Sequence, residues 1–147
     1  MKRVLMLLVC VFSLSMSSSA HISDKTIQVN QLPTAAQAFI KKHFPNNQVG
    51  LAKLDSDWFD KSYDVIFTNG DKVEFDKNGN WKEVKCVSGS QVPSPIIPAR
   101  IQAYVTKSYS GVVIEEIELG GKGYEVKLSN HLELKFDKQF NLIDIDK

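Results

Sequence analysis

The sequence predicts an α+β protein in which a helix followed by a four-stranded antiparallel meander occurs twice, with the helices packed on one face of the sheet. The first observation is that residues 63–85 and 124–146 align without a gap. The second is that an amphipathic helical segment precedes each of these stretches. Seven positions of the alignment are identical: Tyr63/Tyr124, Val65/Val126, Asn69/Asn130, Phe75/Phe136, Asp76/Asp137, Lys77/Lys138 and Asn80/Asn141.

Residues Met1–Ala20 have the pattern of a cleaved signal peptide. Lys2 and Arg3 are followed by an apolar run over 4–14, and Ser18 and Ala20 place small residues before the expected cut. A retained membrane anchor is the alternative, but this run falls short of the ~20 residues that span a bilayer. We therefore expect a periplasmic or secreted protein that starts near His21 and has no membrane span.

The composition of the mature chain excludes two classes of partner. Without Lys2 and Arg3 the 18 basic residues become 16, against 17 acidic ones, which gives a net charge of −1. Binding to nucleic acid or an anionic membrane would call for a basic patch. Cys86 is the one cysteine that remains, so no internal disulfide can form. Pairing between chains or thiol reactivity are open roles, although its place at a strand end favours a buried small apolar residue.

The chain divides into an N-terminal extension over 21–31, a first unit over 32–87, a linker over 88–96 and a second unit over 97–147, which together make one domain. The extension either adds an edge strand or stays loose. The first helix occupies 32–45, with Pro33 at its first position and Ala36, Phe39, Ile40 and Phe44 on one face. Asn69-Gly70 predicts a two-residue type I′ turn in the first meander.

The second unit repeats this order. Ile97-Pro98 repeats Leu32-Pro33 at the start of its helix, and Ile101, Tyr104, Val105 and Tyr109 take the places of the apolar residues in the first helix. The segment 120–123 replaces a longer loop over 55–62 that carries Trp58 and Phe59. Matching helices, strands and turns indicate a duplication.

The face of the sheet away from the helices is expected to be charged and solvated, as an antiparallel sheet allows. Lysines and carboxylates alternate along its strands, which predicts cross-strand ion pairs. Large aromatic and aliphatic residues on such a polar surface are preferred interface anchors. The candidate binding residues are Trp58, Phe59, Ile66 and Trp81. The alternative is that Trp58 and Trp81 cover the end of the core.

The sequence does not predict an enzyme. His21, His43 and His131 are the histidines, and they are scattered over the terminus, a helix and a turn. The chain contains no zinc-binding HExxH motif, no paired cysteine motif and no nucleophile elbow. No organic cofactor is expected.

Calcium is an alternative ligand at the turn over 76–80. Asp76, Asn78 and Asn80 place oxygens at alternating positions, as at the start of a calcium loop. Gly79 is not at the sixth position, however, and Val87 stands where the bidentate glutamate would be. The competing interpretation is a hairpin turn built from residues that tolerate left-handed backbone.

The motifs resemble those of the PepSY-like family of exported bacterial proteins. The helix motif is Leu32-Pro33, Phe39-Ile40, Lys42 and Phe44-Pro45. The meander motif is Tyr63, Val65, Phe67, Gly70, Glu74-Phe75-Asp76, Gly79 and Trp81. The resemblance spans essentially the whole mature chain, and implies the fold of the β-lactamase-inhibitor protein, an envelope location, a source among the Bacteroidetes and a concave sheet that holds a protein or peptide. It brings no catalytic motif, and the contact residues of the inhibitor have no counterpart here.

We therefore expect a non-enzymatic exported module that binds an envelope protein or peptide through the open face of its sheet, with inhibition of that partner as one outcome. A calcium-regulated protein is the first alternative. A structural protein that forms homo-oligomers, for instance through an exposed strand edge, is the second.

Overall fold

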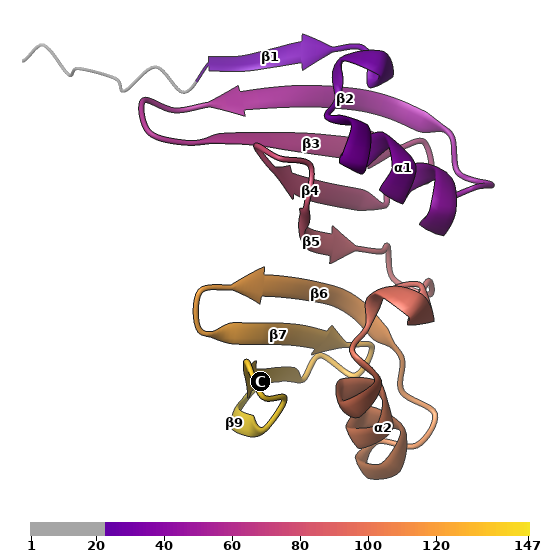
Figure 1. The fold of residues 1–147 in the computed structure, drawn as a ribbon. Helices are drawn as coiled ribbons and strands as arrows, with labels where there is room; N and C mark the ends of the chain where they lie inside the picture. The colour runs from indigo at the N-terminus through magenta and orange to yellow at the C-terminus, as the bar shows by residue number, and fades with distance from the viewer. Residues whose placement is uncertain (1–22) are drawn as a thin grey trace, which may run out of the picture.

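The computed structural model describes residues 23–147, so the predicted signal peptide, Met1–Ala20, lies outside the described residues. Two helices and nine strands follow one another along the chain (Figure 1). Their bounds are β1 Ser23–Ile27, α1 Thr34–His43, β2 Val49–Ser56, β3 Lys61–Phe67, β4 Lys72–Asp76, β5 Trp81–Lys85, α2 Ala99–Ser108, β6 Ile114–Gly120, β7 Gly123–Leu128, β8 Glu133–Asp137 and β9 Leu142–Asp146. Short 3₁₀ turns occupy Val29–Gln31 and Ser94–Ile96.

All nine strands form one antiparallel sheet in chain order, from β1 at one edge to β9 at the other. The predicted α+β class is therefore confirmed, and the two meanders share a sheet. Of the two possibilities for the N-terminal extension, the edge strand is the one observed, because β1 pairs with β2. The join between the halves is the pairing of β5 with β6, which aligns Val84 with Ile117.

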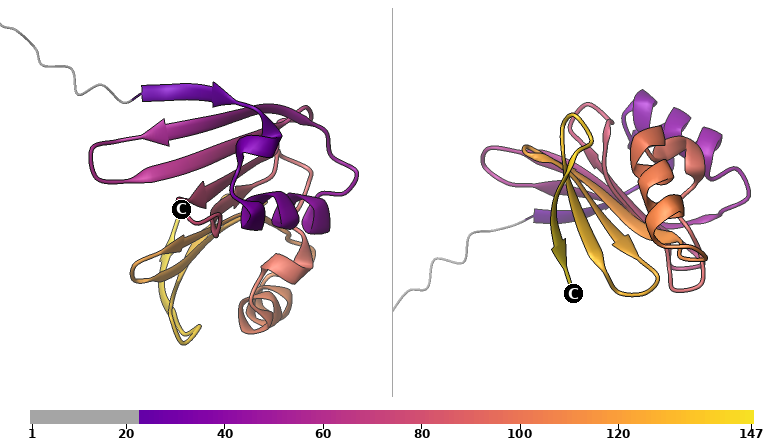
Figure 2. Two further views of the ribbon diagram at one scale, coloured as in Figure 1. Left: turned by 45° about the horizontal axis from the view of Figure 1, so that its top comes forward. Right: turned by 90° about the horizontal axis from the view of Figure 1, so that it is seen from below.

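Both helices lie on the same side of the sheet and leave the other side open (Figure 2). Each helix begins one residue later than predicted, with Pro33 and Pro98 as N-caps. Aromatic side chains at each helix pack against aromatic side chains of the strands that follow it. The Phe44 ring stacks on Phe67 at 4.8 Å between centroids, and Tyr104 meets Phe136 edge-on at 5.6 Å. Burial of such rings is the main favourable term in folding.

The linker between the halves belongs to the core. Val92 and Ile96 are buried, as is Ile97, which follows the linker. The Val92 amide donates a hydrogen bond to the Ile114 carbonyl at 2.9 Å. The linker therefore closes the helix side of the join between β5 and β6.

The turn between β3 and β4 differs from the predicted type I′ turn. Of Asn69 and Gly70, only Gly70 has a positive φ, 95°. The Gly70 amide donates to the Phe67 carbonyl, and the Phe67 amide donates to the Asp71 carbonyl. This is a three-residue loop that ends in a left-handed glycine. The Asn69 side chain donates to the Asp71 carboxylate at 2.9 Å and accepts the Asp71 amide at 3.1 Å. The second half has the same loop with Leu132 in the place of Asp71, so the contact to the backbone amide is the one that both loops share.

Asp71 is the buried charged residue of the described chain, with 5% of its surface exposed. One carboxylate oxygen accepts the Val87 amide at 3.0 Å, and the other accepts the Asn69 and Asn47 side-chain amides at 2.9 and 3.4 Å. These contacts tie the end of α1, the β3–β4 turn and the exit of β5 together. A buried carboxylate is tolerated here because several donors replace its water.

We predict that Asp71→Ala lowers the free energy of unfolding by about 2–3 kcal/mol, because the Val87 amide and the Asn69 and Asn47 side chains lose a charged acceptor. Urea denaturation followed by circular dichroism measures this change. Asp57→Ala on an exposed loop is the control, with an expected change within about 0.5 kcal/mol. Equal losses in the two variants would show that the carboxylate is not a structural acceptor.

Candidate interaction surface

Two cross-strand rows of side chains cover the open face from β2 to β9. The glutamate row carries four glutamates in direct succession, and the mixed row alternates in sign from Lys85 to Glu133 and ends on Asp146. The glutamate row is Lys53, Asp64, Glu74, Glu83, Glu118, Glu125, Lys135 and Asp144. The mixed row is Leu51, Ile66, Lys72, Lys85, Glu116, Lys127, Glu133 and Asp146.

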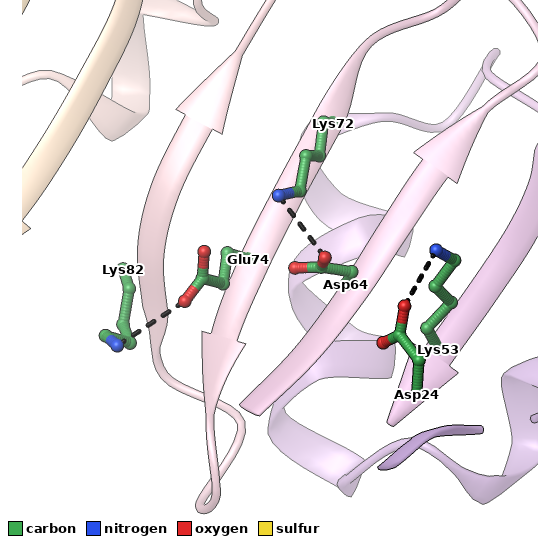
Figure 3. A network of polar contacts seen from close by, with 6 residues as sticks. All are labelled: Asp24, Lys53, Asp64, Lys72, Glu74 and Lys82. Carbon is green, nitrogen blue, oxygen red and sulfur yellow. Dashed lines mark hydrogen bonds and ion pairs between the residues drawn. The ribbon is translucent and has the colours of Figure 1, made fainter. Parts of the chain in front are cut away.

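In the first half of the sheet, neighbouring lysines neutralise the carboxylates. Figure 3 shows three ion pairs on this part of the face. They join Lys53 to Asp24 at 3.2 Å, Lys72 to Asp64 at 3.3 Å and Lys82 to Glu74 at 3.4 Å. The predicted cross-strand ion pairing is confirmed here. Each pair is partly exposed and contributes little to stability by itself.

Around the join of the halves, carboxylates face carboxylates. Glu83 lies between Glu74 and Glu118 in the glutamate row. Partial burial, followed by a hydrogen bond shared with Glu116, raises the pKa of Glu83 to about 7. Because like charges directly opposite destabilise a sheet, retention of a proton is the response that removes the repulsion.

A second proton is held further along the same row. A hydrogen bond shared with Glu133, followed by burial, raises the pKa of Glu125 to about 7. The nearest lysine in the row, Lys135, forms an ion pair with Asp146, with 2.6 Å between its Nζ and the Asp146 Oδ2. The open face therefore gains negative charge around the join and in the second half between mildly acidic and neutral pH, whereas the carboxylates of Asp24, Asp64 and Glu74 keep their lysine partners.

The β2–β3 hairpin carries two uncovered aromatic side chains. Trp58 is 86% exposed and Phe59 is 96% exposed. The Asp57 amide donates to the Asp60 carbonyl at 3.0 Å, and the Asp57 carboxylate accepts the Trp58 amide at 2.6 Å. The loop is therefore internally braced while its aromatic rings point away from the core. Trp58 does not cover the end of the core, which was the alternative for it.

Ile66 lies on the open face as expected, half-buried between Leu51 and Lys72. The expectation that Trp81 lies on this face is wrong. A β-bulge makes Trp81 the partner of Phe75, so it packs against the hydrophobic core, and Lys82 becomes the extra residue. Strand alternation alone could not reveal this bulge. Of the four candidate residues, Ile66 therefore lies on the open face and Trp58 and Phe59 lie on the hairpin that borders it. Trp81 lies on the core side of the sheet.

In the turn proposed for calcium, both carboxylate oxygens of Asp76 already accept hydrogen bonds from the turn itself. One oxygen of Asp76 accepts the Asn78 and Asn80 amides at 2.8 and 2.9 Å, and the other accepts the Asn80 side chain at 3.1 Å. These donors lower the pKa of Asp76, although burial opposes the shift most strongly. Asp137 makes the same three contacts in the second half. A metal role for Asp76, Asn78 and Asn80 stays a prediction.

The other titratable residues do not form a reactive centre in the part of the chain that the structure describes. Cys86 is buried as expected, and burial raises the pKa of its thiol to about 12, which leaves it protonated. Burial, with a smaller effect of Lys42, lowers the pKa of His43 on α1. Over residues 23–147 no group of three histidine, cysteine or acidic side chains is placed to hold a metal ion.

The fold and surface define an α+β sheet protein with one face covered by helices and one open polar face. The family described as "Putative beta-lactamase-inhibitor-like, PepSY-like" matches residues 61–144. The chain therefore belongs to the PepSY-like family, as its motifs indicated. None of the curated proteins matches it.

Solved structures support this assignment. A "putative periplasmic protein from DUF2874 family" of Bacteroides vulgatus is 59% identical, with a TM-score of 0.81, and the match covers 85% of this chain and 98% of that one. A "putative calcium-regulated periplasmic protein" of Bacteroides thetaiotaomicron is 60% identical, with a TM-score of 0.82 and coverage of 84% and 97%. A second Bacteroides vulgatus protein, of unknown function, is 37% identical, with a TM-score of 0.80 and coverage of 84% and 99%.

These relatives confirm the expected location: the protein is periplasmic. No helix within residues 23–147 is long and apolar enough to cross a bilayer. The row of four glutamates was missed at the sequence level, since it depends on the register of β5 against β6.

We predict that Glu83→Gln stabilises the protein at about pH 8 by roughly 0.2–1 kcal/mol, the range for relief of a like-charge cross-strand pair. The folded-state pKa of Glu83, about 7, lies above the ordinary value of 4.5. Its stabilising contribution is therefore complete below pH 4.5 and disappears as the pH rises through about 7.

Thermal melts at about pH 5 and about pH 8 check this prediction, because the variant should gain only at the higher pH. Asp57→Asn, which keeps the acceptor for the Trp58 amide, is the control and should show no pH-dependent difference. A gain of equal size at both pH values would contradict the proton held at Glu83.

Proposed function

We propose that this protein is a non-enzymatic periplasmic binding module that holds a protein or peptide partner against the open face of its sheet and the β2–β3 hairpin. The observation that carries the proposal is the near-complete exposure of Trp58 and Phe59 beside a face that no helix covers. Exposed aromatic pairs are costly on a protein that has no partner for them, and they are frequent interface anchors.

The chemistry of the surface supports binding over catalysis. The described residues offer ion pairs, shared protons and a protonated buried thiol, and none of these supplies a nucleophile beside a base. Family membership agrees with this interpretation, because the family is described as beta-lactamase-inhibitor-like. The partner is an envelope protein or peptide, and inhibition is one consequence that its capture could have.

The two halves support a proposal about origin as well. We propose that they derive from one duplicated helix-and-meander unit. Gly70 and His131, 61 residues apart, both have positive φ, 95° and 68°. Gly79 and Phe140, with the same spacing, have φ of 85° and 65°. Non-glycine residues rarely adopt such angles, so their recurrence at one spacing argues for a shared ancestor of the two turns.

Replacement of Trp58 and Phe59 by alanine should abolish capture of the partner and leave the melting temperature unchanged, because neither side chain is buried. Affinity capture from the native envelope, quantified for wild type and the double variant, measures this effect. The control is Val29→Ala, which removes another exposed apolar side chain. A partner retained equally by all three proteins would remove the hairpin from the binding surface, and a lower melting temperature would indicate a structural role.

A second candidate function is calcium regulation. It is favoured by the 60%-identical relative described as calcium-regulated and by the acidic hairpin end, where Asp55, Asp57 and Asp60 line a cavity of about 130 Å³. Asp76 is occupied by its own turn, and the three hairpin aspartates do not form a metal-binding group as they stand, so an ion would have to draw them together.

Under this candidate, calcium at about 1 mM should raise the melting temperature of wild type, since an ion that binds only the folded state stabilises it. The triple change of Asp55, Asp57 and Asp60 to asparagine should abolish the shift, whereas Asp76→Asn should leave it intact. Calorimetry without heat, together with an unchanged melt, would remove the calcium function.

A further inference from the structure

A mostly apolar cavity of about 280 Å³ lies at the end of the β6–β7 hairpin, beside the glutamate row. We call it the hairpin pocket. Gly120, Gly121 and Gly123 form one wall, and Ile143 forms another. A side chain at Gly123 would overlap the Phe136 carbonyl oxygen, because this glycine has a φ of 146° and lies directly against β8. Glycine at this position therefore lets the hairpin lie close to β8 with no side chain in the pocket.

The size of the hairpin pocket limits what can enter it. It exceeds the ~150 Å³ of an apolar cavity that holds benzene. It falls just below the ~300 Å³ at which pockets for drug-sized molecules begin. The space therefore suits a single aromatic or large aliphatic side chain.

The charge beside the pocket is negative and not neutralised. Glu118 and Glu125 line it, and neither takes part in an ion pair of the described residues. Lys135 also lines it but is held by Asp146 at 2.6 Å. Lys122 is exposed in the hairpin turn, so its ammonium group can remain in water. An apolar group that enters the pocket will therefore bind best with a cation next to it.

The first half of the sheet lacks this combination at the corresponding place. There the bulge residue is Lys82, which pairs with Glu74 at 3.4 Å. In the second half the bulge residue is Ile143, which is 59% exposed. An exposed isoleucine in a charged row has no structural use that the described contacts reveal, and it supplies the pocket with an apolar wall.

We propose that the hairpin pocket binds an aromatic side chain of the protein partner, with a lysine or arginine adjacent to it in the partner's sequence placed against Glu118 and Glu125. This inference rests on the proposed function, since it names the part of the open face that selects the partner and the chemistry it selects. The aromatic ring gains from apolar burial against Ile143 and the glycine wall. The cation gains from carboxylates that have no lysine of their own.

Short blocked peptides test the pocket directly, without the natural partner. The probe is acetyl-Trp-Lys-amide, with acetyl-Trp-Glu-amide and acetyl-Ala-Lys-amide as comparisons. We expect saturable amide chemical-shift changes at Gly121, Gly123 and Ile143, with a dissociation constant of about 1 mM for the Trp-Lys peptide. The Trp-Glu peptide should bind about tenfold more weakly or worse, and the Ala-Lys peptide should not saturate.

Substitutions of two exposed isoleucines in β9 locate the site. Ile143→Lys should abolish binding of the Trp-Lys peptide, because it fills the apolar wall with a cation. Ile145→Lys is the control, since this residue is also exposed, at 46%, and does not line the pocket. Equal loss in both variants would overturn the assignment of the site, as would binding that survives Ile143→Lys.

The charge requirement has its own test. Glu125 faces Glu118 on β6, with Glu133 and Lys135 on β8, and a shared proton raises its pKa to about 7. The Trp-Lys peptide should therefore bind more tightly at about pH 8 than at about pH 5, and Glu125→Gln should remove most of this difference. Equal binding of the Trp-Lys and Trp-Glu peptides at both pH values would overturn the role of the carboxylates.

The outcomes separate this inference from the function on which it rests. Peptide binding with no capture of an envelope partner would support the pocket and contradict the proposed function. Capture that Ile143→Lys leaves unchanged, together with the absence of saturation by the Trp-Lys peptide, would overturn the pocket and leave the function standing.

Discussion

The pairing of β5 with β6 is the constraint on which the rest of the structure depends. Only three residue pairs align across it, and the central pair, Val84 and Ile117, is fully buried. A half of about fifty residues is near the size at which a lone core is marginal, so each half needs the other to cover its edge. The linker completes this join from the helix side through Val92. The short β5–β6 pairing therefore joins the halves into one sheet with one continuous core.

The same pairing determines the electrostatics of the open face. Alignment of Val84 with Ile117 necessarily places Glu83 beside Glu118, because strand neighbours alternate between the faces. Apolar burial on the helix side decides the register, since a shift by one residue would expose every core side chain of the strand. Four glutamates in succession are the consequence, and the protons held by Glu83 and Glu125 reduce the repulsion. The negative charge of the second half is therefore coupled to the way the halves join.

Sequence patterns predicted most of the fold because its elements are local. Helix periodicity, alternation and turn residues located both helices and all the strands of the meanders. The errors lie where strand pairing fixes a detail that residue type and alternation do not. A three-residue loop closed by Phe67 and Asp71 takes the place of the predicted type I′ turn, and a bulge moved Trp81 to the core. The candidate surface was predictable in kind, with Ile66 on the open face and Trp58 and Phe59 exposed, but its charge distribution required the β5–β6 register.

The two halves differ most in the hairpins at the same end of the sheet. The turns at Asp76 and Asp137 keep identical hydrogen bonds, because each closes a hairpin against a helix and has little freedom to change. The β2–β3 hairpin, in contrast, is long and carries Trp58 and Phe59, while the β6–β7 hairpin is short and built on glycine. Loop tips of this kind vary more easily than the strands they join, although Gly123 is fixed by its close approach to Phe136. Under the proposed function, the protruding aromatic pair on one half and the side-chain-sized cavity on the other would contact the same partner at two places.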